Sequence, residues 1–284
     1  MSTNGTTITL TPLGDGVWAW IHPFTDRVAS NSAVVLDDDG LTVIDSDGLA
    51  RHHRAFASAV AGLGYPVRRL VLTHSHLDHV AGVEAIGAER NLATEKTIAA
   101  LDGPAQTGPM QALQPDIADE IAELTNPEGL EQLTALDSIT PRLKAIECHG
   151  HSTSDLVLHV PDAGIVIAAD MCFFGTVPVG FQGDLDAWAD SLTRVRELGT
   201  TVVPGHGPVG DVGDVDAVAA YLDAVREADD ADSMPPGPWD DWRDPFATKI
   251  PRAMTQINIE RHGMNVRGEQ GFPPTAMKLV QPAG

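Results

Sequence analysis

The chain has 284 residues, of which 43% are hydrophobic, and carries a formal net charge of −22. That apolar content is ample for a large buried core, and the length predicts one or two domains. The strong negative charge opposes binding to nucleic acid and to anionic membranes, which attract basic surfaces, so it argues against a nuclease.

The N-terminal part of the chain predicts strands followed by a helix. Runs of β-forming residues predict strands at 7–13, 16–21, 32–36 and 41–44. An amphipathic pattern then predicts a helix over 49–63.

Three features of this part bear on function. The loop after the second strand, at 22–27, carries Phe24. Asp45 follows the fourth strand directly. His52 and His53 lie on the predicted helix, away from any ligand spacing, and we expect both to be surface residues.

An apolar strand at 70–72 leads into the sequence Thr73-His74-Ser75-His76-Leu77-Asp78-His79. Neutral imidazoles and carboxylates are the ligands that suit zinc and other borderline divalent metals. Helical spacing follows, and we expect Asp78 to cap a helix that ends at Gly87. Because alternate residues diverge, Asp78 and His79 can reach a second metal, so the spacing predicts more than one ion.

The middle of the chain contains a long irregular segment. After a short strand at 92–93 and a short helix at 95–101, glycines and prolines interrupt all periodicity over 102–116. This predicts a long loop between two halves of the fold, and such loops often act as lids. We expect Met110 and Leu113 to be its apolar contacts with substrate; a surface connector without substrate contact is the alternative. A helix over 116–124 and alternation over 131–139 follow.

The second half repeats the combination of a strand and a candidate ligand. The run 143–147 leads to His151, the run 164–169 ends at Asp170, and the run 201–204 leads to His206. Ligands delivered at the ends of several strands can converge at one edge of a sheet. The apolar segment after Asp170 is expected to line the pocket through three side chains, Cys172, Phe173 and Phe174.

Helices are predicted over 185–198 and 214–227, and residues 1–232 form the predicted main domain. The remaining tail, 233–284, offers one predicted helix over 246–259. We expect this extension to pack on the same domain; covering the active site or forming a homodimer are the alternatives.

The motifs THSHLDH, GHS, AAD and PGHG, in this order, resemble those of the metallo-β-lactamase superfamily over roughly residues 8–225. The resemblance implies an α/β fold, a four-layer αβ/βα sandwich with a dinuclear metal site at one edge of its two sheets. Asp45 matches a superfamily aspartate that accepts a hydrogen bond from a metal-bound imidazole. In the superfamily a loop at the position of Phe24 often overhangs the site, so the resemblance implies that Phe24 touches substrate; an ordinary hairpin tip is the alternative. The implied ligands are His74, His76 and His151 for the first metal, Asp78, His79 and His206 for the second, and Asp170 as the bridge.

The resemblance implies two divalent cations, with Zn²⁺ preferred and iron or manganese as alternatives. Such a pair lowers the pKa of a shared water so that hydroxide exists near neutral pH. Asp78 is placed to orient that hydroxide, and no serine or cysteine nucleophile is needed. The bridging aspartate resembles the thioesterase, lactonase and phosphodiesterase branches. We therefore expect hydrolysis of an ester, thioester or lactone of a small molecule.

Two other functions remain open. Relatives that oxidise persulfides use a mononuclear non-haem iron, for which His74, His76, His151 and Asp170 could serve. A phosphodiesterase is the second alternative. The complete second ligand set favours the dinuclear hydrolase over the oxygenase.

The expected cellular location follows from the absence of a recognisable secretory segment and of a membrane helix. Residues 1–9 are polar, without a basic segment before an apolar one, and no apolar run approaches the ~18 residues of a membrane helix. Cys148 and Cys172 are too few for a disulfide framework, and we expect both to be small buried hydrophobes. A cytoplasmic protein without nucleic-acid or membrane partners is the expectation.

Overall fold

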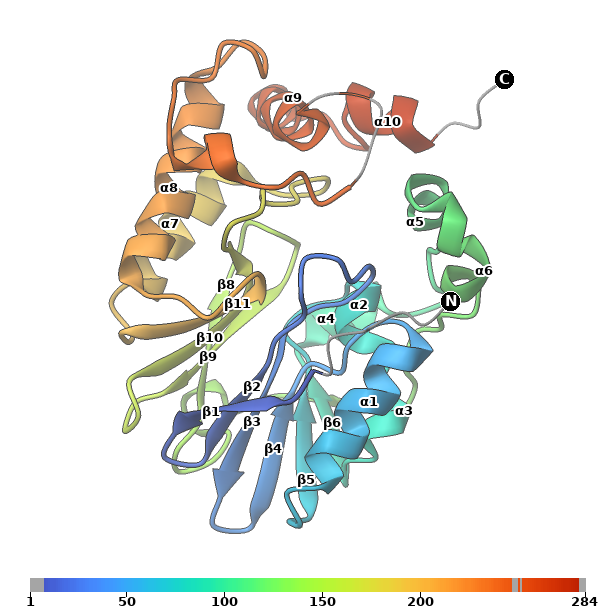
Figure 1. The fold of residues 1–284 in the computed structure, drawn as a ribbon, viewed down its shortest axis with the longest axis vertical. Coiled ribbons are helices and arrows are strands. Elements are labelled where there is room, and N and C mark those ends of the chain that lie inside the picture. The colour runs from blue at the N-terminus through green and yellow to red at the C-terminus, as the bar shows by residue number, and fades with distance from the viewer. Residues whose placement is uncertain (1–7, 247–249, 251, 281–284) are drawn as a thin grey trace.

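Two β-sheets lie at the centre of the protein, and helices cover their outer faces (Figure 1). The computed structural model describes residues 8–246, 250 and 252–280. The first predicted strand, 7–13, therefore begins one residue outside the described part, and the observed strand starts at Leu10.

The first sheet contains seven strands in the order of the sequence. Its first four strands are antiparallel neighbours, whereas β4 to β7 run parallel to one another. Helix α1 (Ala50–Ala61) makes the crossover from β4 to β5. The strands are β1 (Leu10–Gly14), β2 (Val17–Trp20), β3 (Ser32–Asp37), β4 (Gly40–Ile44), β5 (Val67–Val71), β6 (Arg90–Ala93) and β7 (Glu131–Gln132).

The second sheet has four strands in the order β11-β10-β9-β8. Its central strand β10 pairs antiparallel with β9 and parallel with β11, and helix α7 (Leu185–Val195) lies between β10 and β11 in the chain. The strands are β8 (Lys144–Cys148), β9 (Asp155–Val160), β10 (Ile165–Phe173) and β11 (Thr201–His206).

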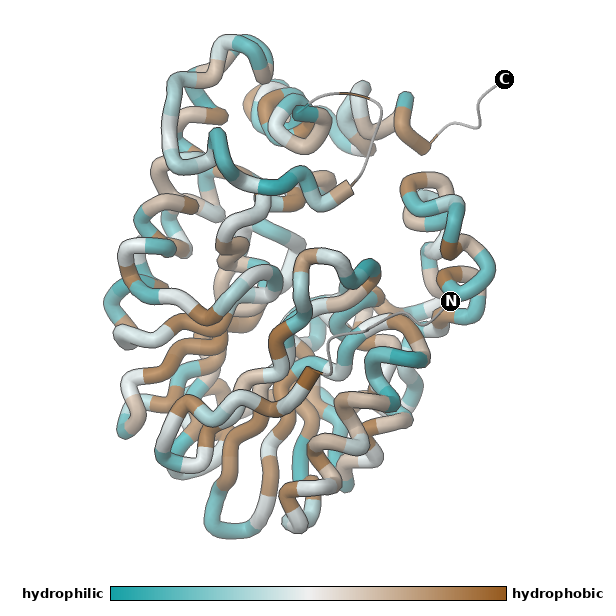
Figure 2. The backbone as a smooth tube through the Cα atoms, in the orientation of Figure 1, coloured by the Kyte–Doolittle hydropathy of each residue, from teal (hydrophilic) through white to brown (hydrophobic). Residues whose placement is uncertain are grey.

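Three buried clusters hold these layers together, and neighbouring residues of one strand enter different clusters. Val35 and Ile167 belong to the cluster between the two sheets. Val34 packs with Phe56 of α1 on the outer face of the first sheet, and Val166 packs with α7 on the outer face of the second. Because both faces are covered, the strands read as continuous apolar runs, visible as brown segments in Figure 2.

The C-terminal segment adds helices α8 (Val212–Glu227), α9 (Ala253–Arg267) and α10 (Pro274–Val280). Met254, Ile257 and Ala276 lie in the same buried cluster as residues of α7 and α8. Helix α9 contacts α7 and α8, and α10 contacts α5 in the first half of the chain (Figure 1). Its division from the rest at residue 232 stays a prediction.

The irregular segment 102–116 was predicted as a loop, and this prediction was wrong in part. Residues Gly108–Leu113 form helix α5, followed by a 3₁₀ turn, Pro115–Ile117, and helix α6 (Ala118–Ala122). Pro109 stands in the first turn of α5, where a missing N–H breaks no intrahelical bond. The prolines there start helices instead of preventing them.

The tail helix also differs from its prediction. Of the range 246–259, residues 247–249 and 251 lie outside the described part, and α9 begins at Ala253 and continues to Arg267. Its inward face includes polar residues such as Asn258 and Arg261, so an apolar pattern could not mark its bounds. Helix α10 was not predicted.

Smaller differences occur elsewhere. The alternation over 131–139 yields only the short β7 and a 3₁₀ turn, Leu136–Ser138. The helix expected after the histidine motif is two short helices, α2 (Leu77–Val80) and α3 (Val83–Ile86), and helix α4 is Glu95–Ala100. A 3₁₀ turn, Pro238–Asp241, precedes α9. Within the described residues, none of the helices has the length and apolarity to cross a bilayer.

Candidate metal centre

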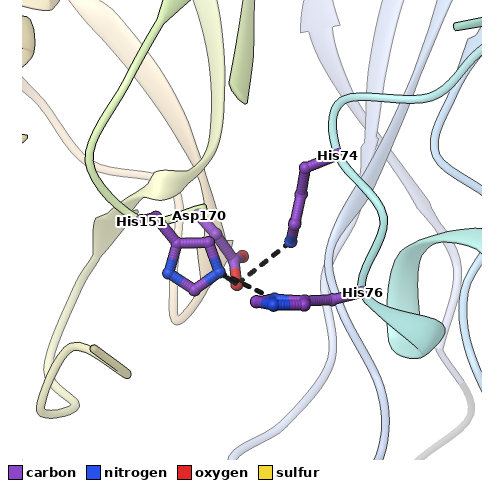
Figure 3. A group of neighbouring side chains, drawn as sticks. All are labelled: His74, His76, His151 and Asp170. Carbon is purple, nitrogen blue, oxygen red and sulfur yellow. Dashed lines mark hydrogen bonds and ion pairs between the residues drawn. The ribbon is translucent and has the colours of Figure 1, made fainter. Parts of the chain in front are cut away.

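The ends of the strands bring seven histidine and aspartate side chains to one edge of the two sheets. The turn after β5 carries His74 and His76, and helix α2 carries Asp78 and His79. The turn after β8 carries one more, and β10 and β11 each carry one. Their potential ligand atoms form two groups, each within 4.8 Å. The first group is His74, His76, His151 and Asp170 (Figure 3), and the second is Asp78, His79 and His206.

Asp170 lies between the two groups, with one carboxylate oxygen facing each. Oδ1 is 3.0 Å from Nε2 of His79 and 3.4 Å from Nε2 of His206. Oδ2 is 3.2 Å from Nε2 of His151 and 3.8 Å from Nε2 of His74. A carboxylate with its oxygens divided in this way can serve two metal ions at once.

Asp45 and Thr73 fix the rings of two of the histidines. Asp45 Oδ2 lies 2.7 Å from Nδ1 of His79 and accepts a hydrogen bond from the Thr73 hydroxyl at 2.8 Å. The same hydroxyl lies 3.0 Å from Nδ1 of His74 and, with its own hydrogen given to Asp45, accepts there. Both rings therefore carry their hydrogen on Nδ1 and present Nε2 to the centre, which is the usual role of such partners.

A β-bulge and a glycine allow Asp170 its position. The register of β10 against β11 shifts at Ala169, which has a φ of 46°. A bulge of this kind re-aims the following side chain. Opposite it, a Cβ on Gly205 would lie 1.8 Å from Oδ1 of Asp170. The first glycine of the PGHG motif is therefore required, because any side chain at that position would collide with the Asp170 carboxylate.

The side chain of Asp78 does not cap a helix, contrary to expectation. His76 occupies the N-cap position of α2, and Asp78 lies in its first turn. The Ser30 hydroxyl donates a 2.7 Å hydrogen bond to the Asp78 carbonyl. Because the cap position falls elsewhere, the Asp78 carboxylate faces His206, whose Nε2 is 3.5 Å away.

The donor set fits divalent metal ions. Within the described part of the chain, Nε2 of His74, Nε2 of His79, Nδ1 of His151 and Oδ1 of Asp170 are buried atoms without a hydrogen-bond partner. Buried polar atoms are normally paired, and leaving one unpaired costs about 1–3 kcal/mol. Three of these atoms face one another across the centre, so cations bound there would satisfy them together.

Three of the ligands already have the charge state that metal binding requires, whereas His79 and His206 do not. Burial lowers the pKa of His151 to about 3 and holds that of His74 well below its usual range, so both are neutral imidazoles, the form that binds metal. Burial opposes ionisation of Asp170, but His79, His206 and His151 outweigh it and hold its pKa well below its usual range. The bridge position is therefore anionic.

Burial opposes protonation of His79, but Asp170 and Asp45 raise its pKa. Burial also opposes protonation of His206, but Asp170 and Asp78 raise its pKa. Both histidines would therefore lose a proton when an ion binds.

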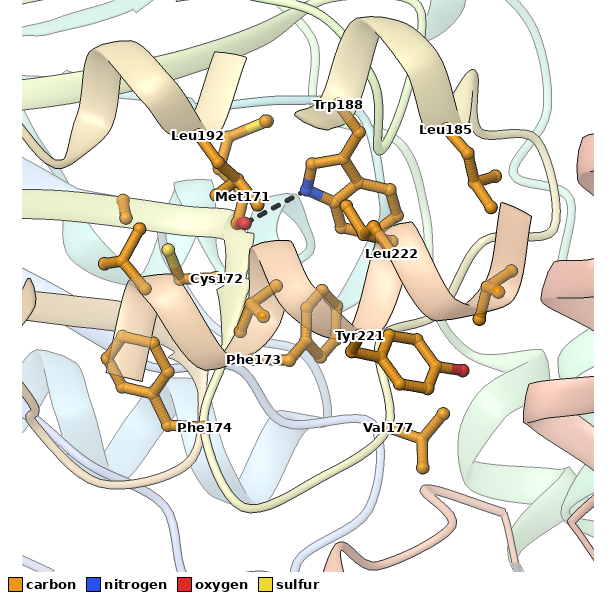
Figure 4. Packing of buried hydrophobic residues seen from close by; sticks show 14 of the residues in the cluster. Met171, Cys172, Phe173, Phe174, Val177, Leu185, Trp188, Leu192, Tyr221 and Leu222 are labelled. Atoms are coloured by element: carbon orange, nitrogen blue, oxygen red, sulfur yellow. Dashed lines mark hydrogen bonds between the residues drawn. The ribbon is translucent and has the colours of Figure 1, made fainter. Parts of the chain in front are cut away.

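Apolar residues contact one ligand of each group from the side of the second sheet. Phe173 stacks on His206 with 5.0 Å between ring centroids, and Trp188 lies edge-on to His151 at 5.3 Å. The Trp188 indole donates a 3.0 Å hydrogen bond to the Met171 carbonyl (Figure 4). Burial by these rings excludes water behind the ligands.

The residues expected to line the pocket are found in different places. Cys172, Phe173 and Phe174 all belong to the buried core on the outer face of the second sheet (Figure 4). Of the three, Phe173 also has ring contacts with the ligands His151 and His206. Phe24 is exposed on its loop, with the Arg243 guanidinium 5.1 Å from its ring centroid. Met110 and Leu113 are half-buried in α5. Contact of these residues with substrate stays a prediction.

Both cysteines are free and buried. Burial raises the pKa of the Cys148 thiol to about 11 and raises that of Cys172 further. Neither supplies a thiolate at neutral pH.

Sequence reasoning missed Thr73 and Asn31. The Asn31 side chain donates hydrogen bonds to the carbonyls of Pro204 (2.9 Å) and Gly207 (2.7 Å), so it braces the turn that carries His206. Thr73 stands directly before the first histidine, which is a usable signal. Asn31 lies more than 170 positions from the carbonyls it binds, and only the fold brings them together.

Residues 25–207 match the metallo-β-lactamase superfamily. Among curated proteins, a β-lactamase-like protein 2 homologue of Caenorhabditis elegans is 30% identical over 157 residues, covering 54% of this chain and 47% of the relative. A hydroxyacylglutathione hydrolase of Cereibacter sphaeroides is 28% identical over 145 residues, covering 50% and 49%. The chain thus spans about half the length of these relatives.

Solved structures share the fold at low sequence identity. The metallo-β-lactamase FIM-1 of Pseudomonas aeruginosa, in a mono-zinc form, superposes with a TM-score of 0.58 at 20% identity, covering 76% of this chain and 95% of that one. A β-lactamase domain protein of Burkholderia ambifaria gives a TM-score of 0.60 at 21% identity, covering 79% and 80%.

Proposed function

Because the chain belongs to the metallo-β-lactamase superfamily, we propose that it is a hydrolase of small molecules that uses two divalent metal ions at the ends of its strands. The observation that carries this proposal is Asp170, whose two oxygens face two separate groups of ligands. A single ion would need only the first group and would leave Asp78, His79 and His206 without a role.

His74, His76 and His151 would hold one ion, Asp78, His79 and His206 the other, and Asp170 both. Ions so held supply Lewis acidity and a water-derived nucleophile near neutral pH. Nitrogen and carboxylate donors favour zinc, and iron and manganese accept the same ligand types. The ligand types therefore support a hydrolytic centre without naming its metal.

The protein's own residues divide the remaining tasks. Asp45 and Thr73 orient the rings of His79 and His74. Asp78 is half-buried, so its carboxylate is accessible to solvent and can accept a hydrogen bond from an attacking water. Phe173 and Trp188 keep water from the rear of the site. We assign Asp78 as the catalytic residue and the others as positioning residues.

For the substrate we propose a carboxylic ester, thioester or lactone. The net charge of −22 repels polyanionic nucleic acid. The relative from Cereibacter sphaeroides is named a hydroxyacylglutathione hydrolase, which supports a thioester, although the match covers half of each chain. A small molecule is thus the proposed partner, with phosphodiesters as the competing substrate class.

The test combines metal analysis with a substrate screen. We call the seven ligands around Asp170, in the two groups described above, the strand-end centre. Protein purified without chelator should carry two transition-metal ions there and hydrolyse a member of a panel of lactones, aryl esters, thioesters, phosphodiesters and β-lactams. Chelator-treated protein is the control and should be inactive until metal is restored. A single iron with oxygen consumption on a persulfide would overturn the proposal.

A further inference from the structure

Another group of ligand-type side chains lies outside the strand-end centre. His22 follows β2, Asp26 is in the loop after it, and His52 is in the first turn of α1. Their potential ligand atoms lie within 4.8 Å of one another. Both histidines are buried, whereas the side chain of Asp26 is 27% exposed. The group is thus closed on the protein side and open to solvent at its carboxylate.

The two ring nitrogens of His22 meet different carboxylates. Nδ1 lies 2.8 Å from Oδ2 of Asp26, and Nε2 lies 2.5 Å from Oδ2 of Asp47. Asp47 is fully buried, and its Oδ1 accepts a 2.8 Å hydrogen bond from the Gly48 backbone. Metal-binding histidines commonly direct one nitrogen to the ion and the other to such a carboxylate. Nε2 of His22 also faces the Trp20 indole N–H at 3.1 Å, so it is occupied by Asp47 and Trp20, and Nδ1 is left as the ligand atom.

The segment between β4 and α1 also carries the aspartate that orients a histidine of the strand-end centre. Asp45 holds Nδ1 of His79 as Asp47 holds Nε2 of His22. Both aspartates have left-handed backbone conformations, with φ of 59° and 69°. Non-glycine residues in that region carry strain, of order 1–3 kcal/mol each. Strain is thus retained at both positions where a carboxylate orients a histidine.

His52 contributes an unsatisfied nitrogen. Its ring is more than nine-tenths buried, its centroid is 4.9 Å from that of His22, and its Nδ1 lies 4.0 Å from Oδ1 of Asp47. Within the described residues, that nitrogen has no hydrogen-bond partner. Burial lowers the pKa of His52, so the ring is neutral. A buried neutral imidazole with a free nitrogen is ready to accept a cation.

Charge and ligand type narrow the choice of cation. Asp26 and Asp47 together carry two negative charges, which one divalent ion balances when both histidines are neutral. Two imidazoles and one carboxylate suit zinc and similar ions, because calcium and magnesium prefer oxygen ligands. The pKa of Asp26 is lowered chiefly by its hydrogen bond with His22, and Arg51 adds a smaller effect of the same sign. The Arg51 guanidinium itself pairs with Glu120.

We propose that His22, Asp26 and His52 form a third divalent-metal site, of the zinc class, oriented by Asp47 and completed by water at the exposed side of Asp26. Without an ion the potential ligand atoms lie within 4.8 Å of one another, and binding requires them to shift to the spacing that the ion sets. Tetrahedral zinc with bonds of about 2.1 Å keeps its ligand atoms about 3.4 Å apart. Burial opposes protonation of His22, but its hydrogen bonds to Asp26 and Asp47 raise its pKa to about 9, so the ion would replace a proton on this ring.

The site fastens the loop between β2 and β3 to the start of α1. That loop also carries Ser30, which binds the Asp78 carbonyl, and Asn31, which binds the turn around His206. The third ion thus has a structural role, stabilising a loop that braces two ligands of the strand-end centre. It does not take part in the reaction, so the inference is independent of which substrate is hydrolysed.

Equilibrium dialysis of the full chain against zinc at pH 8, with metal counted per chain, tests the proposal. His52→Gln and Asp26→Asn should each bind one zinc fewer than the wild type. His53→Gln, on the same helix but outside the group, is the matched control and should bind as many as the wild type. The test depends on the difference of one zinc ion per chain between wild type and variant. It therefore holds even if the strand-end centre binds a single ion.

The position of the third ion is tested by anomalous diffraction at the zinc edge, from crystals grown with zinc. A peak within bonding distance of His22 Nδ1 and Asp26 supports the site. Equal zinc counts in the wild type and His52→Gln, or no peak there while the strand-end centre is filled, would overturn it. Asp26 is partly exposed, so Asp26→Asn keeps the test decisive if the buried His52→Gln variant fails to fold.

Discussion

The Thr73 hydroxyl donates a 2.8 Å hydrogen bond to Asp45, and this bond determines how the hydroxyl meets the neighbouring His74. Having given its hydrogen to the carboxylate, the oxygen can only accept from Nδ1 of His74. One carboxylate thereby sets the ring tautomer of two histidines, His79 directly and His74 through the threonine.

Thr73→Val keeps the shape of the side chain and removes this acceptor. Partners of this kind are worth about 10–100-fold in metal affinity, so we expect a loss within that range. Competition with a chromophoric chelator measures it. Thr42→Val is the control, because that buried hydroxyl binds Asp37 instead of a ligand. Equal affinities of both variants would contradict the role given to Thr73.

Asp170→Ala and His206→Ala should differ in how many ions they release. Asp170 faces both groups, so its removal should weaken two ions, whereas loss of His206 should weaken one. Metal content after dialysis against a weak chelator distinguishes the two outcomes. Loss of the same single ion from both variants would show that Asp170 does not bridge.

Gly205→Ala should disable the centre without touching a ligand. The added methyl would stand 1.8 Å from Oδ1 of Asp170 and 2.8 Å from the backbone of the same residue, so the carboxylate must move. We expect loss of metal and a lower melting temperature. Gly108→Ala is the control, since nothing lies within 4 Å of its added Cβ and its φ is unstrained. A Gly205→Ala variant with full metal content would refute the argument.

Much of this arrangement could be predicted from sequence because it is local. The strands are buried on both faces, so their apolar runs are continuous, and each ligand follows or ends such a run within a few residues. Asp170 and His206 are therefore identifiable by position. The pairing of Asp170's two oxygens with different histidines is set by a bulge and a glycine and could not be read from spacing.

The features that sequence reasoning missed depend on distant partners. His52 was expected at the surface but is buried, because its helix turn packs against His22 and Asp47 from other segments. The side chain of Asn258, in α9, can be buried because it donates hydrogen bonds to the Pro178 carbonyl (2.8 Å) and to the Tyr221 hydroxyl (2.9 Å). Polar residues with buried partners break the apolar pattern from which helices are predicted.

The two thiols should be inert in the folded protein. With a pKa of about 11, only about one Cys148 thiol in a thousand is a thiolate at pH 8, and the side chain is buried. Alkylation by iodoacetamide should become faster as the pH rises toward 11 and much faster on unfolding in urea. Cys148→Ala should keep its hydrolytic activity. Rapid labelling of native protein at pH 7 would show that burial does not protect the thiol.

Helix α5 is expected to act as part of a lid over the centre. It contacts α10, so the C-terminal helices connect the α7–α8 side of the protein to the first half of the chain (Figure 1). Met110 packs on the core beneath and Leu113 is half-buried, which leaves the helix held by few apolar contacts. Elements with few such contacts open most readily.

Replacing residues 104–113 by a short Gly/Ser linker removes α5 and its contact with α10. If the helix gates the pocket, kcat/KM for the best substrate should change at least tenfold, about 1.4 kcal/mol in transition-state binding, with metal content intact. A Gly/Ser replacement of residues 127–129, in the next loop, should leave kcat/KM unchanged. Steady-state kinetics on every hydrolysed substrate checks both variants. The same kinetics in both would make α5 a connector, because a helix that bounds the substrate site cannot be removed without altering how the transition state is held.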